Sequence, residues 1–267
     1  MGLLGLSTWL CQKNLHQADE SSARGFAPIE MWSEDSGKNL IDSFQRWPNN
    51  TTVAASTGAN KSSYYTTYID AIIQTLPHHS SLGKALNHVA QKGYPTGPRT
   101  EFYFTRNTWP AQTAAFSPHF LEKPLLRQTS KNAPSPVVII LFGPDIAEKP
   151  QGAYQRYRKK AQQLADSLSH HFGLAPNHIK VIRANSPQAD RWRTDPCSLF
   201  PETFSFENKD VLLTYIGHGG EVNGFWYGSG LTEVDFQKIA AQLHGATHVG
   251  LVVFSCHSGA LVGTPKH

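Results

Sequence analysis

The fold of this chain is constrained most by short apolar runs that stop at glycine, proline or polar residues. Val137–Phe142, Val211–Ile216 and Val249–Phe254 are dominated by apolar side chains, many of them β-branched. Uninterrupted apolar runs of this length are typical of strands buried on both faces of a parallel sheet. A shorter run, Ile179–Ile182, lies between the first two. The sequence therefore predicts four strands of a mostly parallel sheet.

The segments between these strands carry helical patterns. From Tyr154 to Phe172 the apolar residues recur at helical spacing, and Gly173 follows as a C-cap. Thr232 begins a second helical pattern, with Asp235 placed to complete a capping box. The polar, aromatic and proline-containing segment 190–208 is expected to be a loop. Strands alternating with helices predict an α/β fold of three layers, α/β/α, in which ligands bind at the carboxyl ends of the strands.

The amino-terminal part of the chain has a different character. Residues 1–50 have a mixed composition and form an N-terminal extension, whereas the proline-rich residues 107–135 have no clear period and resemble a surface linker. Residues 51–106 and 136–267 form two halves, and we expect 51–267 to be one domain. The elements expected in the first 106 residues are helices at 39–47, 63–76 and 82–91 and strands at 51–56 and 101–105.

Composition narrows the classes of partner. With 39% hydrophobic and 16% charged residues over 267 positions, the chain suits a soluble globular protein with a substantial core. Its formal net charge is +4, and the densest basic cluster, Arg156 to Lys160, falls on the first helical segment. A solvated helix face explains this cluster, so no nucleic-acid partner is expected. No apolar run approaches the length of a membrane span.

The cysteines are few and widely spaced. Cys11, Cys197 and Cys256 are odd in number and form neither a disulfide framework nor a metal-binding motif. They favour a reducing compartment, the cytoplasm. No histidine pair has a spacing that indicates a metal site. We therefore expect no metal and no cofactor, although the sequence leaves assistance by a calcium ion open.

A histidine and a cysteine follow directly on two of the predicted strands. His218 comes after Val211–Ile216 in a glycine-rich segment, and Cys256 comes after Val249–Phe254 and one serine. Because the carboxyl ends of parallel strands meet at one edge of a sheet, we expect the thiol and the imidazole to lie together.

This pairing suits nucleophilic catalysis. A cysteine attacks as the thiolate, which a neighbouring base helps to form, and the imidazole can then protonate the leaving amine. The backbone N–H groups of Gly219 and Cys256 are placed to donate to the oxygen of a tetrahedral intermediate. His257 adjoins the cysteine, but strand alternation points it the other way and no catalytic role is expected for it. The hypothesis is a cysteine hydrolase, most favourably a peptidase.

Two segments carry a family resemblance. Tyr215-Ile-Gly-His-Gly219, followed by Phe254-Ser-Cys-His-Ser-Gly259, resembles the paired motifs of the caspase-like (clan CD) cysteine peptidases, which include caspases, metacaspases, legumains and gingipains. The second segment is close to the metacaspase nucleophile motif, and the match covers about residues 136–262. The resemblance implies a caspase-like α/β/α fold, a His218/Cys256 dyad, an oxyanion hole at the amides of Gly219 and Cys256, and a cofactor-free endopeptidase acting on polypeptides.

The order of the segments departs from this family. There the chain continues after the cysteine into a small-subunit half that completes the sheet, whereas this sequence ends at His267. Residues 51–106, with their predicted strand, two helices and strand, resemble the missing half. Our hypothesis is a circular permutant with residues 107–135 as the new connection, which is tolerable where termini lie close at the surface. The rival is a fragment of a tandem array or of a cleaved precursor.

The resemblance also places the substrate pocket. It implies that Phe254 and Ser255, just before the nucleophile, line the pocket together with residues in and after the strand at 51–56. These further residues are Ser56, Thr57 and Lys61. Metacaspases hold Asp at the position of Phe254, which matches basic substrates. Since that carboxylate is missing here, we expect the substrate residue before the cut to be neutral or acidic.

Two alternatives remain open at this point. The chain could be a catalytically inactive caspase-like scaffold or adaptor module, as the incomplete pocket suggests. It could also be a transpeptidase or ligase that uses the same dyad and transfers the acyl group to an amine, as legumain-like relatives make plausible.

Overall fold

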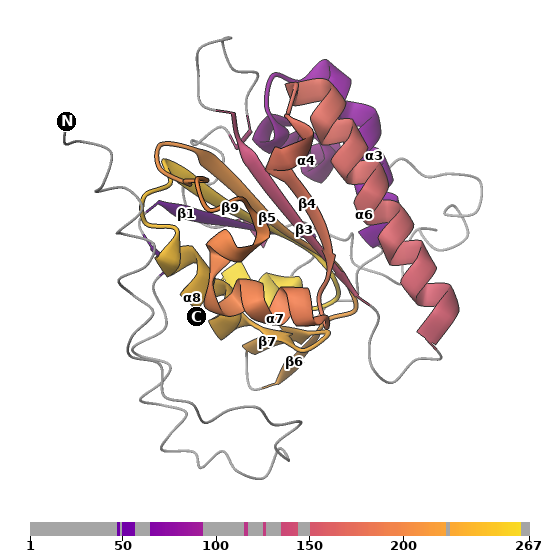
Figure 1. The fold of residues 1–267 in the computed structure, drawn as a ribbon. Coiled ribbons are helices and arrows are strands. Elements are labelled where there is room, and N and C mark those ends of the chain that lie inside the picture. Colours follow the sequence, from indigo (N-terminus) through magenta and orange to yellow (C-terminus); the bar gives the residue numbers. More distant parts are fainter. Residues whose placement is uncertain are drawn as a thin grey trace, which may run out of the picture.

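The computed structural model describes residues 47–48, 50–56, 65–92, 115–116, 125–126, 135–143, 150–222 and 225–262. Its centre is a six-stranded sheet in the order β2–β1–β9–β5–β3–β4 (Figure 1). All its neighbouring strands run parallel except β2, which pairs antiparallel with β1. The strands are β1 (Thr51–Ala55), β2 (Ala115–Phe116), β3 (Val137–Gly143), β4 (Ile179–Arg183), β5 (Asp210–Gly217) and β9 (His248–Phe254).

Helices cover both faces of the sheet (Figure 1). One face packs against α3 (Tyr65–Thr75), α4 (Leu82–Lys92) and α6 (Pro150–Phe172). The other packs against α7 (Pro187–Thr194), α8 (Glu233–Gln242) and the 3₁₀ helix η6 (Ser258–Val262). Three shorter 3₁₀ helices are η3 (Leu76–His78), η4 (Pro176–His178) and η5 (Pro196–Leu199). The predicted three-layer α/β/α arrangement is confirmed.

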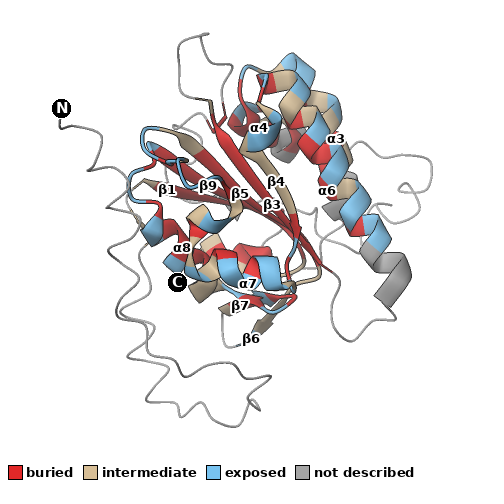
Figure 2. Ribbon diagram, viewed as in Figure 1, coloured by how far each residue is buried: buried red, intermediate tan, exposed pale blue. Residues whose placement is uncertain are grey.

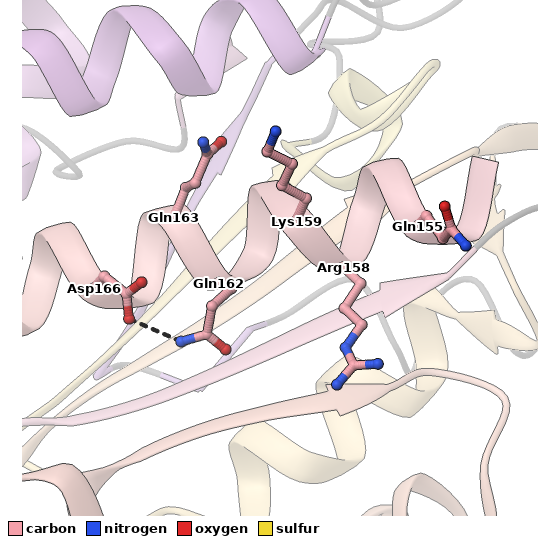
Figure 3. A pocket seen from close by; sticks show the side chains of 6 residues that line it. All are labelled: Gln155, Arg158, Lys159, Gln162, Gln163 and Asp166. Atoms are coloured by element: carbon pink, nitrogen blue, oxygen red, sulfur yellow. Dashed lines mark hydrogen bonds between the residues drawn. The ribbon is translucent and has the colours of Figure 1, made fainter. Parts of the chain in front are cut away.

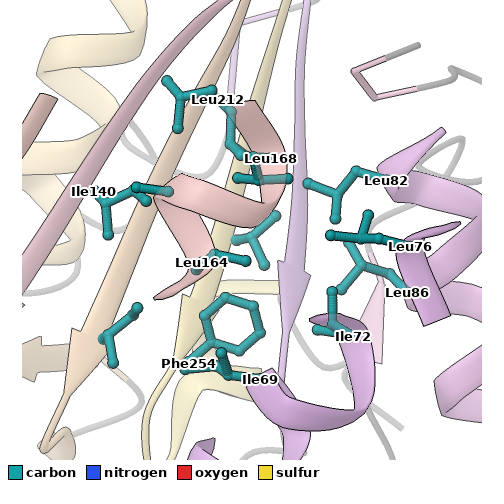
Figure 4. Close-up of a cluster of buried hydrophobic side chains, with 14 of the residues drawn as sticks. Ile69, Ile72, Leu76, Leu82, Leu86, Ile140, Leu164, Leu168, Leu212 and Phe254 are labelled. Carbon is teal, nitrogen blue, oxygen red and sulfur yellow. The ribbon is translucent and has the colours of Figure 1, made fainter. Parts of the chain in front are cut away.

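The two cores follow from strand alternation. In β3, Val138 and Ile140 belong to the cluster under α6, while Val137 and Ile139 belong to the cluster under α7 and α8. Figure 2 shows the central strands buried along most of their length, and Figure 4 shows the first cluster, in which Leu164 of α6 lies among residues of α3, α4 and the sheet. Burial on both faces explains why these strands are apolar runs rather than alternating ones.

Most predicted elements of the carboxyl-terminal half are present within a few residues of their expected bounds. The expected capping box is also present, because the Thr232 hydroxyl accepts a hydrogen bond from Asp235 N at 3.3 Å and the Asp235 carboxylate accepts one from Thr232 N at 2.8 Å. In the amino-terminal half, β1, α3 and α4 match the expected strand and two helices. The helix expected at 39–47 and the strand expected at 101–105 lie wholly or largely outside the described residues.

The first strand lies beside the strand that leads to Cys256. β1 pairs in parallel with β9, with Val53 opposite Leu251 and Ala55 opposite Val253. The hydrogen bond from Ser56 N to Val253 O, 3.0 Å long, continues this pairing past the end of β1. The pairing that the permutation hypothesis required is therefore present.

The prediction of a loop over residues 190–208 was wrong for its first part, residues 190–194. This part continues α7, whose N-cap Ser186 accepts a hydrogen bond from Ala189 N at 3.2 Å and whose first turn contains Pro187. The helix forms because it buries Trp192 completely against the second core. A serine followed by proline is itself a helix-start signal that the sequence analysis overlooked.

The segment 107–135 is more than a surface linker where it is described. Leu125 and Leu126 are fully buried in the first core. Leu125 occupies the space next to Gly250 of β9, where any added Cβ would collide with it. Its carbonyl also accepts a hydrogen bond from Leu82 N at 3.0 Å, at the start of α4. This part of the segment is pinned to the sheet by apolar packing.

Candidate active site

His218 and Cys256 lie at the carboxyl ends of adjacent parallel strands. Ile216 of β5 is in register with Phe254 of β9, and His218 and Cys256 each lie two positions after their residue of this pair. Neighbouring strands are separated by about 4.8 Å. Both residues are half-buried, so each is partly open to solvent. The two residues therefore lie at neighbouring positions along the same edge of the sheet.

Gly219 is tightly packed against the segment that carries Cys256. A Cβ added to it would lie 2.6 Å from Cys256 O, 2.6 Å from Ser255 Oγ and 2.5 Å from Trp226 Nε1. Such separations are too short for any side chain, so the backbone after His218 touches the backbone of the cysteine segment. The two residues predicted to form an oxyanion hole, Gly219 and Cys256, are therefore neighbours in space.

Aromatic residues from both faces of the sheet hold the histidine. The Tyr157 ring of α6 contacts the His218 ring edge to face, with centroids 5.5 Å apart and an interplanar angle of 87°. From the opposite core, the Tyr215 hydroxyl donates a 2.7 Å hydrogen bond to His218 O and shares one of 2.9 Å with the Ser229 hydroxyl. These contacts fix the imidazole from one side and its backbone from the other.

Hydrogen bonds hold the cysteine segment. Trp226 Nε1 donates to Ser255 Oγ at 2.9 Å, and the Ser255 hydroxyl donates to Cys256 O at 3.2 Å. The Ser56 hydroxyl donates to Ser255 O at 3.3 Å from the end of β1. Ser56 and Ser255 are fully buried, so these two predicted pocket residues support the backbone of the segment that carries Cys256.

The other predicted pocket residues have different fates. Phe254 is 2% exposed and lies in the first core, where its ring meets Tyr68 of α3 edge to face at 5.8 Å. Burial raises the pKa of the Tyr68 hydroxyl above its ordinary value, so this contact is apolar and uncharged. Thr57 and Lys61 lie outside the described residues.

His257 and the two other cysteines differ in their surroundings from His218 and Cys256. His257 has a positive φ of 57°, which turns the chain out of β9 into η6. Its Nδ1 is buried, and no partner for it exists among the described residues. Cys197 of η5 is half-buried and packs against the second core. Cys11 lies outside the described residues.

A short antiparallel sheet separates His218 from α8. It consists of β6 (Gly220–Val222), β7 (Phe225–Gly228) and β8 (Leu231–Thr232), and Figure 1 shows β6 and β7 beyond the end of the main sheet. Trp226 of β7 is the residue whose indole reaches Ser255. This sheet and its tryptophan were not predicted from the sequence, although Asn223-Gly224 between β6 and β7 is a strong hairpin signal.

One half-buried acid, Glu233, interacts with the backbone of this tryptophan. Burial raises the pKa of Glu233 to about 7, an effect partly offset by a hydrogen bond from the Trp226 backbone. The Glu233 carboxylate also accepts a 3.0 Å hydrogen bond from Gln237 Nε2. Its charge state near neutral pH is thus coupled to the strand that carries Trp226.

Other surface features of the described residues carry no comparable chemistry. A shallow hollow of about 370 Å³ lies along the exposed face of α6, between long polar side chains such as Arg158 and Gln162 (Figure 3). Lys160 on this helix pairs with Asp70 of α3. Within the described part of the chain, no three His, Cys, Asp or Glu side chains are grouped to hold a metal ion. None of its helices is long and apolar enough to cross a membrane.

No protein-family model matches the chain, and no curated protein sequence matches it either.

Proposed function

We propose that this chain is a cysteine endopeptidase of the caspase-like type, with Cys256 as the nucleophile and His218 as the general base and acid. The observation that carries the proposal is the close approach of Gly219 to the backbone carbonyl of Cys256 and the hydroxyl of Ser255. This contact joins the two motifs at the edge of a parallel sheet where ligands bind in α/β folds.

In the proposed reaction the Cys256 thiolate attacks the carbonyl carbon of a peptide bond. The N–H groups of Gly219 and Cys256 donate to the oxyanion that forms. The His218 imidazolium gives its proton to the leaving nitrogen, the C–N bond breaks and a thioester remains. His218 then takes a proton from water, the hydroxide attacks the thioester, and the thiol leaves with its proton restored.

We further propose that the residue before the scissile bond is neutral or acidic. Phe254 stands where the metacaspase motif holds Asp, and its buried ring against Tyr68 offers no charge to an Arg or Lys side chain. Faster cleavage after Arg than after Asp, Asn or small residues in a peptide library would overturn this preference.

The amino-terminal half belongs to the same proposal. We propose that residues 51–106 act as the small-subunit-like half of a permuted caspase-like chain. The parallel pairing of β1 with β9 supports this, as do the two helices that follow β1.

A thiol-reactive peptide ketone tests the catalytic proposal. Such a probe alkylates an activated thiolate in a peptide-binding site, so we expect labelling of the wild type and its loss in Cys256→Ala and His218→Ala. Cys197→Ser, at the other half-buried thiol, is the matched control and should label normally. Mass spectrometry of the labelled peptide locates the adduct.

The same experiment distinguishes the alternatives. A folded wild type that neither labels nor cleaves any member of a peptide library would be a scaffold and not an enzyme. Products joined to an added amine, in place of free acids, would identify a transpeptidase or ligase.

A further inference from the structure

The exposed apolar side chains of the described residues gather on one hairpin. Val222 of β6 is 44% exposed and Tyr227 of β7 is 46% exposed, and they are the large hydrophobic residues with most exposure in the described part of the chain. Single exposed apolar residues are ordinary on protein surfaces. Two on one hairpin, beginning two residues after His218, call for a more specific explanation.

Strand pairing places both side chains on the same face. Gly220 pairs with Tyr227 and Val222 pairs with Phe225, while the intervening pair, Glu221 and Trp226, points to the opposite face. Trp226 is buried, so its face is the inner one. The outer face therefore carries Val222, the half-buried Phe225 and Tyr227, which we call the hairpin face.

Tyr227 reaches across the hairpin toward its edge. A Cβ on Gly220 would collide with the Tyr227 ring and hydroxyl, so the ring lies over the Gly220 backbone. Among the described residues β6 pairs only with β7, so none of these residues occupies its second edge. Exposed strand edges bind extended peptides by main-chain hydrogen bonds, and nearby side-chain contacts then select the sequence.

The chemistry proposed for His218 and Cys256 indicates which part of a substrate would lie next to the hairpin. The imidazole that protonates the leaving amine must stand on the leaving-group side of the scissile bond. β1 lies on the other side of β9 from β5, so the acyl side of the substrate extends toward β1. The chain that leaves with the amine extends toward His218 and β6.

We propose that the hairpin face binds the polypeptide segment after the scissile bond, as an extended strand beside β6, and prefers a large apolar residue there. This inference rests on the proposed peptidase function. At about 3.3 Å per residue, the segment from Gly219 to Val222 spans the first three substrate residues after the cut.

Two substrate series test the proposal. Both share one acyl-side sequence; one releases an aminocoumarin dye, and the other continues with three residues that contain Leu, Phe, Ser or Asp. We expect wild type to cleave the Leu and Phe peptides with a kcat/KM roughly tenfold above the Ser and Asp peptides, the scale of burying part of one apolar side chain. Tyr227→Ser and Val222→Ser should reduce this preference, whereas Tyr227→Phe should keep it.

The control and the opposing outcomes are distinct. Gln242→Ser, at an exposed position at the end of α8, should leave all ratios unchanged. If the preference for Leu and Phe survives in Tyr227→Ser, the proposal is overturned. It is also overturned if Tyr227→Ser lowers kcat/KM equally for the dye substrate and for the longer peptides, which would indicate a structural role. If Tyr227→Ser instead dissociates a dimer in sedimentation velocity without altering preference, the hairpin face is a contact between copies. A wild type that cleaves neither series refutes the peptidase proposal itself.

Discussion

His218 and Cys256 leave adjacent strands, but different forces hold the segments around them. The His218 ring packs against the Tyr157 ring from one core, and the His218 carbonyl accepts a hydrogen bond from the Tyr215 hydroxyl of the other core. The cysteine segment is held by a series of polar contacts from Trp226 and Ser56 through Ser255. Ring packing tolerates small rotations, whereas a hydrogen-bonded series fixes the backbone direction. The difference suits the proposed roles, a base that moves a proton and a nucleophile whose amide keeps a fixed direction.

The largest effect is expected from the residue that joins the two segments. Gly219→Ala puts a methyl group 2.6 Å from Cys256 O and Ser255 Oγ, so one segment must shift. A displacement near 1 Å costs about 100-fold in rate at an active site, and we expect kcat/KM to fall by at least that factor. Gly245→Ala, whose added Cβ would meet nothing closer than 3.8 Å, is the matched control. Wild-type activity in Gly219→Ala would show that the contact is dispensable.

A smaller effect should separate the polar support from simple packing. Trp226→Phe removes the indole donor to the buried Ser255 hydroxyl. Trp192→Phe removes a buried indole N–H on the same side of the sheet that bonds no described residue. The two variants lose similar side-chain volume. We expect the free energy of unfolding, measured in urea, to fall by about 1 kcal/mol more in Trp226→Phe than in Trp192→Phe, because only Trp226→Phe also loses this hydrogen bond. Equal costs, with equal retention of peptidase activity, would contradict a role for the Trp226–Ser255 bond.

The smallest effect concerns pH. Because the pKa of Glu233 is raised to about 7 from an ordinary value of 4.5, the folded state holds an extra proton between these values. The stability contributed by the neutral carboxyl is present below pH 4.5 and is lost as the pH rises through 7. Glu233→Gln keeps the oxygen that accepts from Gln237 but carries no charge. Its free energy of unfolding should therefore rise relative to that of the wild type as the pH rises, by on the order of 1 kcal/mol at pH 8.

Urea midpoints measured from pH 5 to pH 8 check this expectation. Glu202→Gln, the same change at an exposed carboxylate, is the control. A stability difference between Glu233→Gln and wild type that stays constant over this range would contradict the expected titration.

The sheet, and the positions of His218 and Cys256 at the ends of its strands, could be predicted from the sequence because their signals are local. β3 and β9 are buried on both faces, which makes their apolar runs continuous, and the Thr232 cap lies within one turn of its partner Asp235. The same local chemistry at Ser186, the start of α7, was present and overlooked. Local signals therefore define elements well when each is weighed in turn.

What the sequence could not supply is contact between distant segments. Leu125 is buried because Gly250 leaves room for it, and neither residue predicts the other. In the sequence Trp226 looks like an ordinary aromatic residue of a strand, and only the folded structure shows that its indole bonds Ser255. Likewise, alternation alone directs the Phe254 ring into the core, but only the packing of α3 shows that Tyr68 covers it. Side-chain neighbours from other elements decide these roles.

The place of β9 between β5 and β1 has a consequence for folding during synthesis. Thr51 of β1 pairs with Val249 of β9, about 200 residues later. At roughly 5–20 residues per second, β1 leaves the ribosome some 10–40 s before its parallel partner. Until then the described contacts offer it only the two-residue β2. Cys256 follows β9 directly, so the proposed nucleophile and the strand that joins β1 to the rest of the sheet are synthesised together.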